Sequence, residues 1–291
     1  QGRFYAFALS IRKILGYISG MFETISKTDA LYSPLTGPAD PPVFEPINPE
    51  GSRPLLIICD HASPAMPATL GNLGLDENAV ETHIAYDMGA AEVTGMLAKR
   101  LDAPALLAGY SRLLIDCNRQ PGDPYSIPKV SDGVTIPGNL GLGEEESEAR
   151  AQSFFWPYHH AITSMLAHLW RQGPVPALFS IHSFTPTLGG EDRFWDIGVL
   201  WNRDPRLAQP LLAKLRARDD LLVGDNEPYS GRQIAYTIDL HGGAGGLPNC
   251  AVEIRQDHLE SPQGTARWAA ILGDAFEDIL GIDDLNRVEH Y

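Results

Sequence analysis

The chain has 291 residues, and its 37 acidic residues outnumber its 22 basic residues, which gives a formal net charge of −15. Hydrophobic residues make up 44% of the sequence, and this much apolar surface excludes an intrinsically disordered chain. The acidic excess argues against a nucleic-acid-binding protein, because affinity for the phosphate backbone requires a basic surface. No apolar run approaches the ~20 residues needed to cross a bilayer, so we expect no membrane association.

The first fifty residues differ in composition from the rest. Residues 4–22 are apolar with Arg12 and Lys13 in the middle, whereas a signal peptide places its basic residues before the apolar run. Two interpretations stay open: residues 1–20 are non-native and precede a natural start at Met21, or they form a short amphipathic helix that packs on the body or on a second subunit. Residues 33–54 contain seven prolines, which predicts an extended arm. We therefore expect an extension over residues 1–50, through which the protein could form oligomers, and a single folded domain over residues 51–291.

Apolar runs and helical periodicity alternate along this domain. Short buried runs predict strands, and apolar residues spaced three and four apart predict helices. The expected strands are 55–59, 105–107, 112–117, 177–181, 197–201 and 249–254, and the expected helices are 85–101, 144–169 (with Pro157 as a kink or break), 205–218 and 264–280. This alternation predicts an α/β fold with a mixed, largely parallel central sheet flanked by helices.

Histidines stand at the ends of two predicted strands. His61 follows the strand 55–59, and His182 follows the strand 177–181. Each is either a hydrogen-bonded histidine or a metal ligand through its neutral imidazole, and catalytic zinc needs a third protein ligand. His83 and Asp87 are four residues apart, which would place them on one face of a helix start. Either could complete the site, although Asp87 could instead interact only with the helix dipole.

Two further strand ends carry charged pairs. Glu253 and Arg255 are two residues apart, so they project from the same side of the strand 249–254. They are either a general base with a substrate-binding arginine or a simple ion pair. Asn118 and Arg119 follow the predicted strand 112–117, where they would suit a carboxylate ligand or would form a solvated turn.

The cysteine pattern indicates a reducing compartment. Cys59, Cys117 and Cys250 are an odd number, and no two have the spacing of a metal or redox site, so we expect a cytoplasmic protein. Ser111 lacks the second glycine of a nucleophile elbow, and buried packing accounts for the cysteines, so no motif supports a serine or cysteine hydrolase.

Several of these motifs together resemble a known family. The segments 180–184, 116–119 and 252–255 look like three signature segments of the zinc carboxypeptidase fold, in the same chain order. More closely, the segments 60–63, 83–90, 110–119 and 246–257 resemble the N-formylglutamate amidohydrolase family. The likeness extends from about Leu55 to Leu280, which is most of the chain. It implies a zinc carboxypeptidase-like fold of the phosphorylase/hydrolase-like type.

The resemblance also implies roles for individual residues. The family's two histidine ligands of zinc fall on His61 and His182. Carboxypeptidases carry a glutamate ligand three residues after the first histidine, but Pro64 stands there in this chain, so Asp87 is the first candidate for the third ligand and His83 the second.

The remaining roles concern catalysis and substrate binding. The catalytic glutamate falls on Glu253, and the arginine that stabilises the transition state falls on Arg112. The residues that bind the substrate's carboxylates fall on Asn118 and Arg119, with Arg255 as a further candidate. His241 lies in a glycine-rich stretch with Thr237, where it either contacts the substrate or makes a structural hydrogen bond.

We therefore expect residues 51–291 to form one catalytic domain of a zinc-dependent amidohydrolase that cleaves a small anionic N-acyl amino acid. N-Formyl-L-glutamate, which would give formate and L-glutamate, is the leading substrate. The alternatives are a metallopeptidase or other amide hydrolase of the same fold, and a non-catalytic protein that binds a carboxylate ligand.

Overall fold

A computed structural model describes residues 35–291, and the expected apolar helix in residues 4–22 lies outside the described residues. Its main feature is a seven-stranded sheet in the order β1-β3-β2-β6-β11-β9-β10. The strands are β1 (Phe44–Ile47), β2 (Leu55–Cys59), β3 (Ala105–Ala108), β6 (Ala177–Phe184), β9 (Ile197–Leu200), β10 (Val223–Asp225) and β11 (Asn249–Arg255). Neighbours among β3, β2, β6 and β11 are parallel, while β1 is antiparallel to β3 and β9 is antiparallel to β11.

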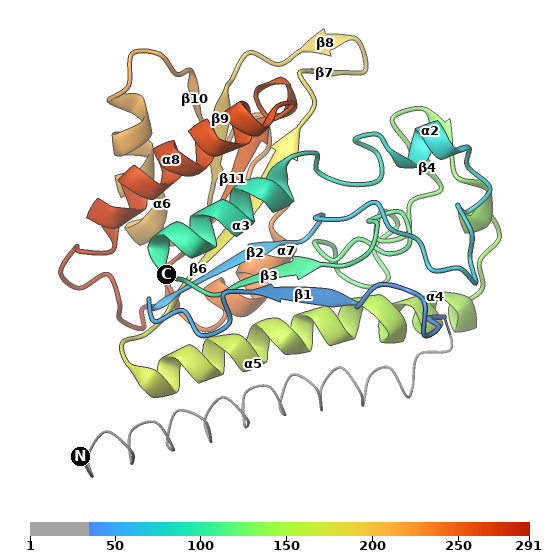
Figure 1. The fold of residues 1–291 in the computed structure, drawn as a ribbon, viewed down its shortest axis with the longest axis horizontal. Coiled ribbons are helices and arrows are strands. Elements are labelled where there is room, and N and C mark those ends of the chain that lie inside the picture. The colour runs from blue at the N-terminus through green and yellow to red at the C-terminus, as the bar shows by residue number, and fades with distance from the viewer. Residues whose placement is uncertain (1–34) are drawn as a thin grey trace, which may run out of the picture.

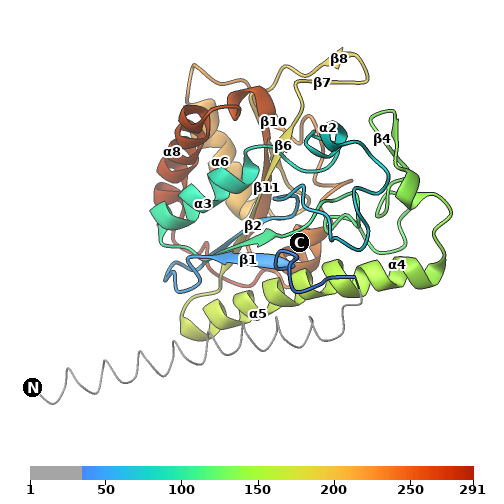
Figure 2. The same cartoon turned by 45° about the vertical axis from the view of Figure 1, so that its right-hand side comes forward.

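Helices cover both faces of this sheet, as Figures 1 and 2 show. The helices α3 (Ala90–Leu101), α6 (Pro205–Arg216) and α8 (Pro262–Ile279) pack on one face, and α5 (Trp156–Gln172) and the short α7 (Tyr236–Ile238) lie on the other. Two further helices, α2 (Glu77–Val80) and α4 (Glu144–Arg150), stand among the loops beyond the sheet. This arrangement confirms the predicted α/β fold with a largely parallel sheet.

The apolar strand sequences follow from burial on both faces. Leu55, Ile57 and Cys59 pack against α3 and α8, whereas Leu56 and Ile58 pack against α5. Successive side chains of a strand point to opposite faces, so a strand covered on both sides needs a continuous apolar run. Parallel strands also end at one edge of the sheet, which brings together the residues that follow β2, β3, β6 and β11.

The expected strand 112–117 is wrong, because these residues form turns. The Ser111 hydroxyl donates to the carbonyl of Ala85 (2.8 Å), and the N–H of Leu113 donates to the same hydroxyl (3.2 Å). A side-chain hydrogen bond of this kind competes with the ladder of a sheet. The apolar residues of this segment are buried under the neighbouring loops, in a cluster apart from the two sheet faces.

The helix expected from residue 85 begins only at Ala90. Gly89 has a φ of 77°, in the left-handed region, which ends any helical path before α3. Asp87 therefore lies in the loop before α3, and its N–H donates to the carbonyl of His61 (2.9 Å). His83 and Asp87 do not share the face of a helix.

The proline-rich arm is partly packed, contrary to the expectation of a free extended segment. Residues 44–47 form β1 and pair with β3, and Phe44 is only 7% exposed. The N–H of Gly109, just after β3, donates to the carbonyl of Val43 (2.8 Å). The described part of the arm thus joins the sheet.

The predicted long helix over 144–169 is divided, as Pro157 suggested. A π-helical turn, η2 (Ala151–Phe155), separates α4 from α5, and Pro157 stands in the first turn of α5. Proline has no N–H to donate and is tolerated in this first turn.

We predict that Gly109→Ala destabilises the fold. A methyl group there would lie 2.0 Å from the carbonyl oxygen of Pro42, so the arm would have to move. Overpacking of this kind costs about 1–3 kcal/mol in the free energy of unfolding, which urea denaturation would measure. Gly95→Ala in α3 is the matched control, because its added methyl group meets no atom within 4 Å beyond the adjacent backbone of its own helix, and the helix should gain up to about 1 kcal/mol. Equal stability of the two variants would contradict this view of the arm.

Candidate active site

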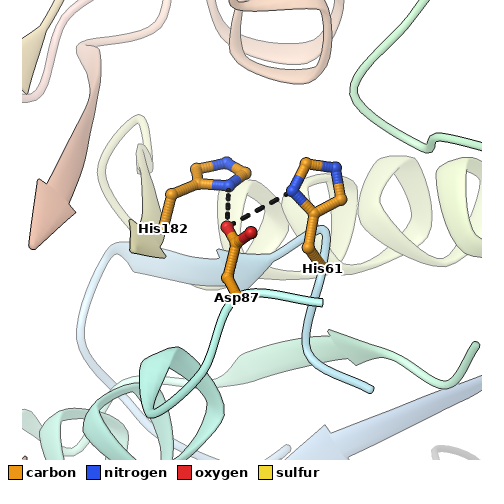
Figure 3. Close-up of side chains that lie close together, drawn as sticks. All are labelled: His61, Asp87 and His182. Carbon is orange, nitrogen blue, oxygen red and sulfur yellow. Dashed lines mark hydrogen bonds and ion pairs between the residues drawn. The ribbon is translucent and has the colours of Figure 1, made fainter. Parts of the chain in front are cut away.

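Three buried side chains from different parts of the chain converge at the carboxyl ends of the parallel strands. His61 follows β2, Asp87 precedes α3, and His182 lies in β6. The Nδ1 atoms of His182 and His61 lie 2.8 Å and 3.3 Å from Oδ2 of Asp87. One ligand atom from each residue lies within 4.8 Å of the others, and Figure 3 shows the two rings facing the carboxylate between them.

Each of the two imidazoles also contacts a second carboxylate through its other ring nitrogen. Nε2 of His61 lies 2.7 Å from Oδ1 of Asp116, and Nε2 of His182 lies 3.1 Å from Oδ2 of Asp60. A carboxylate accepts hydrogen bonds, so a protonated imidazole donates from Nε2 to Asp116 or Asp60 and from Nδ1 to Asp87. Loss of the Nδ1 proton would free that nitrogen's lone pair for a metal ion. Metal-binding histidines are typically oriented by such partners.

The charges of these groups are strongly coupled. Burial alone would raise the pKa of Asp87, but the facing His61 and His182 outweigh it and hold the pKa well below its usual range. Burial and Arg112 oppose a charge on His61, yet Asp116 and Asp87 raise the pKa of that imidazole. The donor set of two imidazoles and a carboxylate is one that zinc commonly takes.

Glu253 lies beside this group on the neighbouring strand. It is paired with His182 in the register of β11 and β6, and it is 7% exposed. Its Oε2 atom is buried without a hydrogen-bond partner among the described residues. Burial raises the pKa of Glu253 to about 7, with His182 opposing this and Asp87 adding to it. An unpaired carboxylate of this kind can accept a proton from a reacting group.

Arg112 connects the carboxylates on the loop side of the site. Its Nη2 lies 2.7 Å from Oδ2 of Asp116, and its Nη1 lies 3.6 Å from Oδ1 of Asp87. These two carboxylates outweigh burial and raise the pKa of the guanidinium, which therefore stays charged.

A cavity of about 310 Å³ opens above these residues. Most of the residues predicted for the site line it: His61, His83, Asp87, Arg112, Asn118, Arg119, His182 and Glu253. Arg119 makes no ion pair with any described residue and lies over the ring of Tyr125, 6.0 Å from its centroid. A guanidinium without a carboxylate partner is available to an anionic ligand.

His83 lines the cavity but lies apart from the His61–Asp87–His182 group. Its Nε2 lies 3.1 Å from Oδ2 of Asp132, at the turn between β4 (Val130–Ser131) and β5 (Val134–Thr135). The side chain of His83 is 29% exposed, whereas His61 and His182 are buried. The structure thus brings Asp87, and not His83, to the two histidines.

Arg255 does not line the cavity. Its guanidinium pairs with Asp257 (2.8 Å) and Asp196 (3.3 Å) and donates to the carbonyl of Phe194 (3.1 Å). The expectation that it faces the same space as Glu253 is therefore not met, because acidic side chains beyond the end of β11 take up its donors.

His241 lies behind the cavity and not in its lining. Its Nε2 is 2.7 Å from Nδ1 of His159 in α5, and the two rings stack with centroids 5.0 Å apart. Nε2 of His159 lies 2.9 Å from the carbonyl oxygen of Cys117. Burial lowers the pKa of His159 to about 4 and that of His241 to about 3, so the pair is neutral at neutral pH.

Several residues of the site were not predicted from the sequence. Asp60 and Asp116 are strand-end or loop acids directly within the motifs, so their position next to His61 and Asn118 could have indicated a role. His159 lies inside a long helix. Tyr229 lines the cavity from a loop, and Gln256 lines it from the start of the short 3-10 helix η4 (Gln256–His258). Only the folded chain brings these residues to the site.

Comparisons with known proteins show the family and the fold. Residues 53–259 match the family model described as N-formylglutamate amidohydrolase. A gene product of Agrobacterium tumefaciens has a similar structure, with 32% sequence identity, a TM-score of 0.82, and coverage of 84% of this chain and 98% of that one. N-Formylglutamate amidohydrolase from Ralstonia eutropha has the same fold, with 18% identity, a TM-score of 0.57, and coverage of 81% and 96%. No curated protein sequence matches the chain.

The pair formed by the buried His159 and the half-buried His241 predicts a loss of stability in mild acid. In the unfolded chain a histidine takes up a proton near pH 6.5, but the folded pair resists protonation down to about pH 4. The unfolded state therefore binds more protons in this window, and folding stability falls as the pH drops through it. Between about pH 7 and pH 5, one such imidazole costs on the order of 2 kcal/mol.

Urea unfolding of the parent and of His159→Gln at these two pH values measures this effect. The variant should lose less stability on acidification than the parent, by about that amount. The same acid-induced loss in both proteins would show that His159 does not resist protonation in the folded state.

Proposed function

Because the chain belongs to the N-formylglutamate amidohydrolase family, we propose that it hydrolyses the amide bond of an N-acyl amino acid, with N-formyl-L-glutamate as the leading substrate and formate and L-glutamate as the products. One observation carries this proposal. A single cavity holds the buried His61–Asp87–His182 group, an unpaired glutamate beside it, and arginines for an anionic substrate. Each of these parts has a role in metal-assisted amide hydrolysis of an anionic substrate.

The proposed cofactor is one zinc ion, with His61, His182 and Asp87 as its ligands. The chemistry of the donor set fits zinc, and the orientation of both imidazoles by Asp116 and Asp60 supports it. The buried carboxylates support it too, because Asp60, Asp87, Asp116 and Glu253 lie together. Arg112 is the arginine that pairs with two of them, Asp87 and Asp116. Zinc would supply Lewis acidity, which polarises a carbonyl oxygen and makes water more acidic.

Glu253 is the proposed general base and acid. Its free carboxylate oxygen takes a proton from the attacking water as the water oxygen bonds to the amide carbon. The same carboxyl group then gives that proton to the amide nitrogen as the carbon–nitrogen bond breaks, so that the amine leaves neutral. Its place on β11 beside His182 keeps this proton carrier next to the reacting bond.

Arg112, Asn118 and Arg119 are the proposed substrate-contacting residues on the loop side. Arg112 is fixed by Asp116 and Asp87, so its charge is preorganised for the oxygen that becomes negative during the attack. Arg119 has no carboxylate partner among the described residues, which suits it to a carboxylate of the substrate. Such roles would give the enzyme a preference for anionic N-acyl amino acids over neutral ones.

We propose the cytoplasm as the compartment. Cys59, Cys117 and Cys250 are buried free thiols, and this supports reducing surroundings. In the described part of the chain, no helix combines the length and the apolar character that a membrane span requires.

We predict that the purified protein binds one zinc ion per chain and that His182→Gln abolishes stoichiometric binding. The glutamine amide can replace Nε2 near Asp60 but offers no atom in place of Nδ1. His83→Gln, the same substitution on the cavity rim, should bind zinc like the parent. Elemental analysis after dialysis, with a chelator titration, measures both.

Two results would contradict the zinc proposal. One is a parent protein without a stoichiometric divalent ion after purification with zinc present. The other is loss of the ion in His83→Gln together with retention in His182→Gln, which would replace His182 by His83 in the ligand set.

We predict that Glu253→Gln lowers kcat for N-formyl-L-glutamate by about 10²–10⁴-fold, because an amide cannot accept the proton of water. Zinc content should remain at the parent level, since Glu253 is not a proposed ligand. Formate release measures the rate, and Glu260→Gln, at an exposed position, is the control with the same chemical change. A Glu253→Gln protein with the parent rate would remove Glu253 from the mechanism.

A further inference from the structure

The loop that carries half of the cavity's charged residues lacks regular secondary structure. Residues 111–119 form turns, yet they contribute Arg112, Asp116, Asn118 and Arg119 to the cavity lining. No ladder of strand hydrogen bonds fixes these residues, so other contacts must hold them in place. Positioning of substrate-binding groups to within a fraction of an ångström needs such support.

Two buried contacts hold the carbonyl of Cys117 in this loop. Nε2 of His159 lies 2.9 Å from that oxygen, and the hydroxyl of Thr237 donates to it from 3.2 Å. His159 is 2% exposed and Thr237 is fully buried. A carbonyl oxygen has two acceptor positions, and both are filled here.

The directions of the hydrogen bonds around His159 follow from this contact. The carbonyl can only accept, so His159 carries its proton on Nε2 and its Nδ1 is an acceptor. His241 must then donate from Nε2 to that Nδ1, over 2.7 Å. The remaining Nδ1 of His241 faces the hydroxyl of Thr163, 3.4 Å away on the next turn of α5.

Both histidines must be neutral for this chain of hydrogen bonds, since a protonated His159 would present a second donor to His241. Burial keeps them so and lowers the pKa of each. The other ionisable groups that act on the pair are Asp60, which favours protonation, and His160, which opposes it.

Thr237 also fixes the orientation of the Asn118 amide. The backbone N–H of Thr237 donates to Oδ1 of Asn118 (3.0 Å), and the N–H of Asn118 itself donates to Asp116 (2.8 Å). With Oδ1 engaged, the NH₂ group of Asn118 remains without a hydrogen-bond partner among the described residues. Asn118 lines the cavity, so this group is a donor available to a carboxylate.

We infer that His159, His241 and Thr237 are positioning residues that hold the loop 116–119 so that Asn118 presents its NH₂ group, and Arg119 its guanidinium, to the substrate's carboxylate. This inference rests on the proposed function, because it assigns these two residues to carboxylate binding. None of the three positioning residues lines the cavity, and they act through the backbone of Cys117 and the amide of Asn118.

The test compares His159→Leu with His168→Leu. Both histidines lie in α5, but His168 contacts Gln172 at the far end of the helix and makes no contact with the loop. His159→Leu should raise KM for N-formyl-L-glutamate about tenfold, the effect of one displaced hydrogen bond to a charged ligand, while kcat and zinc content change little. His168→Leu should match the parent.

The conservative variant distinguishes positioning from general packing. His159→Gln can still donate to the carbonyl of Cys117 from the place of Nε2, so it should restore most of the lost KM effect. If His159→Leu does not fold, Thr237→Val provides the same test, because it removes the hydroxyl contact with Cys117 and keeps the shape of the side chain.

Hydrogen–deuterium exchange supplies a readout that does not depend on activity. The amides of residues 116–119 should exchange at least about tenfold faster in His159→Leu than in His168→Leu, because the loop loses its anchor. If the parent does not hydrolyse N-formyl-L-glutamate but His159→Leu still exchanges faster than His168→Leu, the proposed function is disproved and the positioning role remains. Unchanged KM and unchanged exchange in His159→Leu would overturn the inference.

Discussion

The site depends on one electrostatic constraint: carboxylates are buried together at the carboxyl ends of the central strands. Asp60, Asp87, Asp116 and Glu253 are each less than 10% exposed, and a buried charge is costly unless opposite charges or hydrogen bonds surround it. Arg112 compensates part of this charge, and the two histidines bridge the carboxylates in pairs. The proposed zinc ion would add positive charge next to these carboxylates. The overall charge of −15 therefore says little about the site, where Arg112 and Arg119 line the cavity beside these carboxylates.

The sheet topology places the proposed metal ligand His182 and the proposed general base Glu253 next to each other. Parallel pairing of β2, β6 and β11 places their carboxyl ends side by side, and the register of β6 and β11 puts His182 and Glu253 on adjacent positions. Rigid strands thus carry the proposed ligand and the proposed proton carrier. The loop 111–119 supplies Arg112, Arg119 and Asn118. Contacts from His159 in α5 and Thr237 in α7 to the carbonyl of Cys117 hold this loop in place.

The site residues that lie on a strand or directly after one were predicted from the sequence. A buried strand is a continuous apolar run, so the residue that ends it can be read directly, as with His61, His182 and Glu253. Residues positioned by loops were predicted less well. Asp87 was a candidate through its spacing from His83, and the family resemblance ranked it first, but the helix on which that spacing relied begins only at Ala90. Arg255 and His241 were assigned to the substrate, although their side chains contact Asp257 and His159. Sequence distance does not show which of several acidic or imidazole groups a side chain meets after folding.

The strand β1 also protects the sheet from other molecules. Without it, β3 would leave its N–H and carbonyl groups unpaired along the outside of the sheet, a template on which another chain can add a strand. β1 covers that template and itself contains Pro46, which has no N–H to offer to a further strand. A protein that lacks residues 1–50 would keep every residue of the site. The edge of β3 would then be unpaired and open to strand addition by other chains, which leads to aggregation. The proline-rich segment is thus a requirement for solubility as much as a connection.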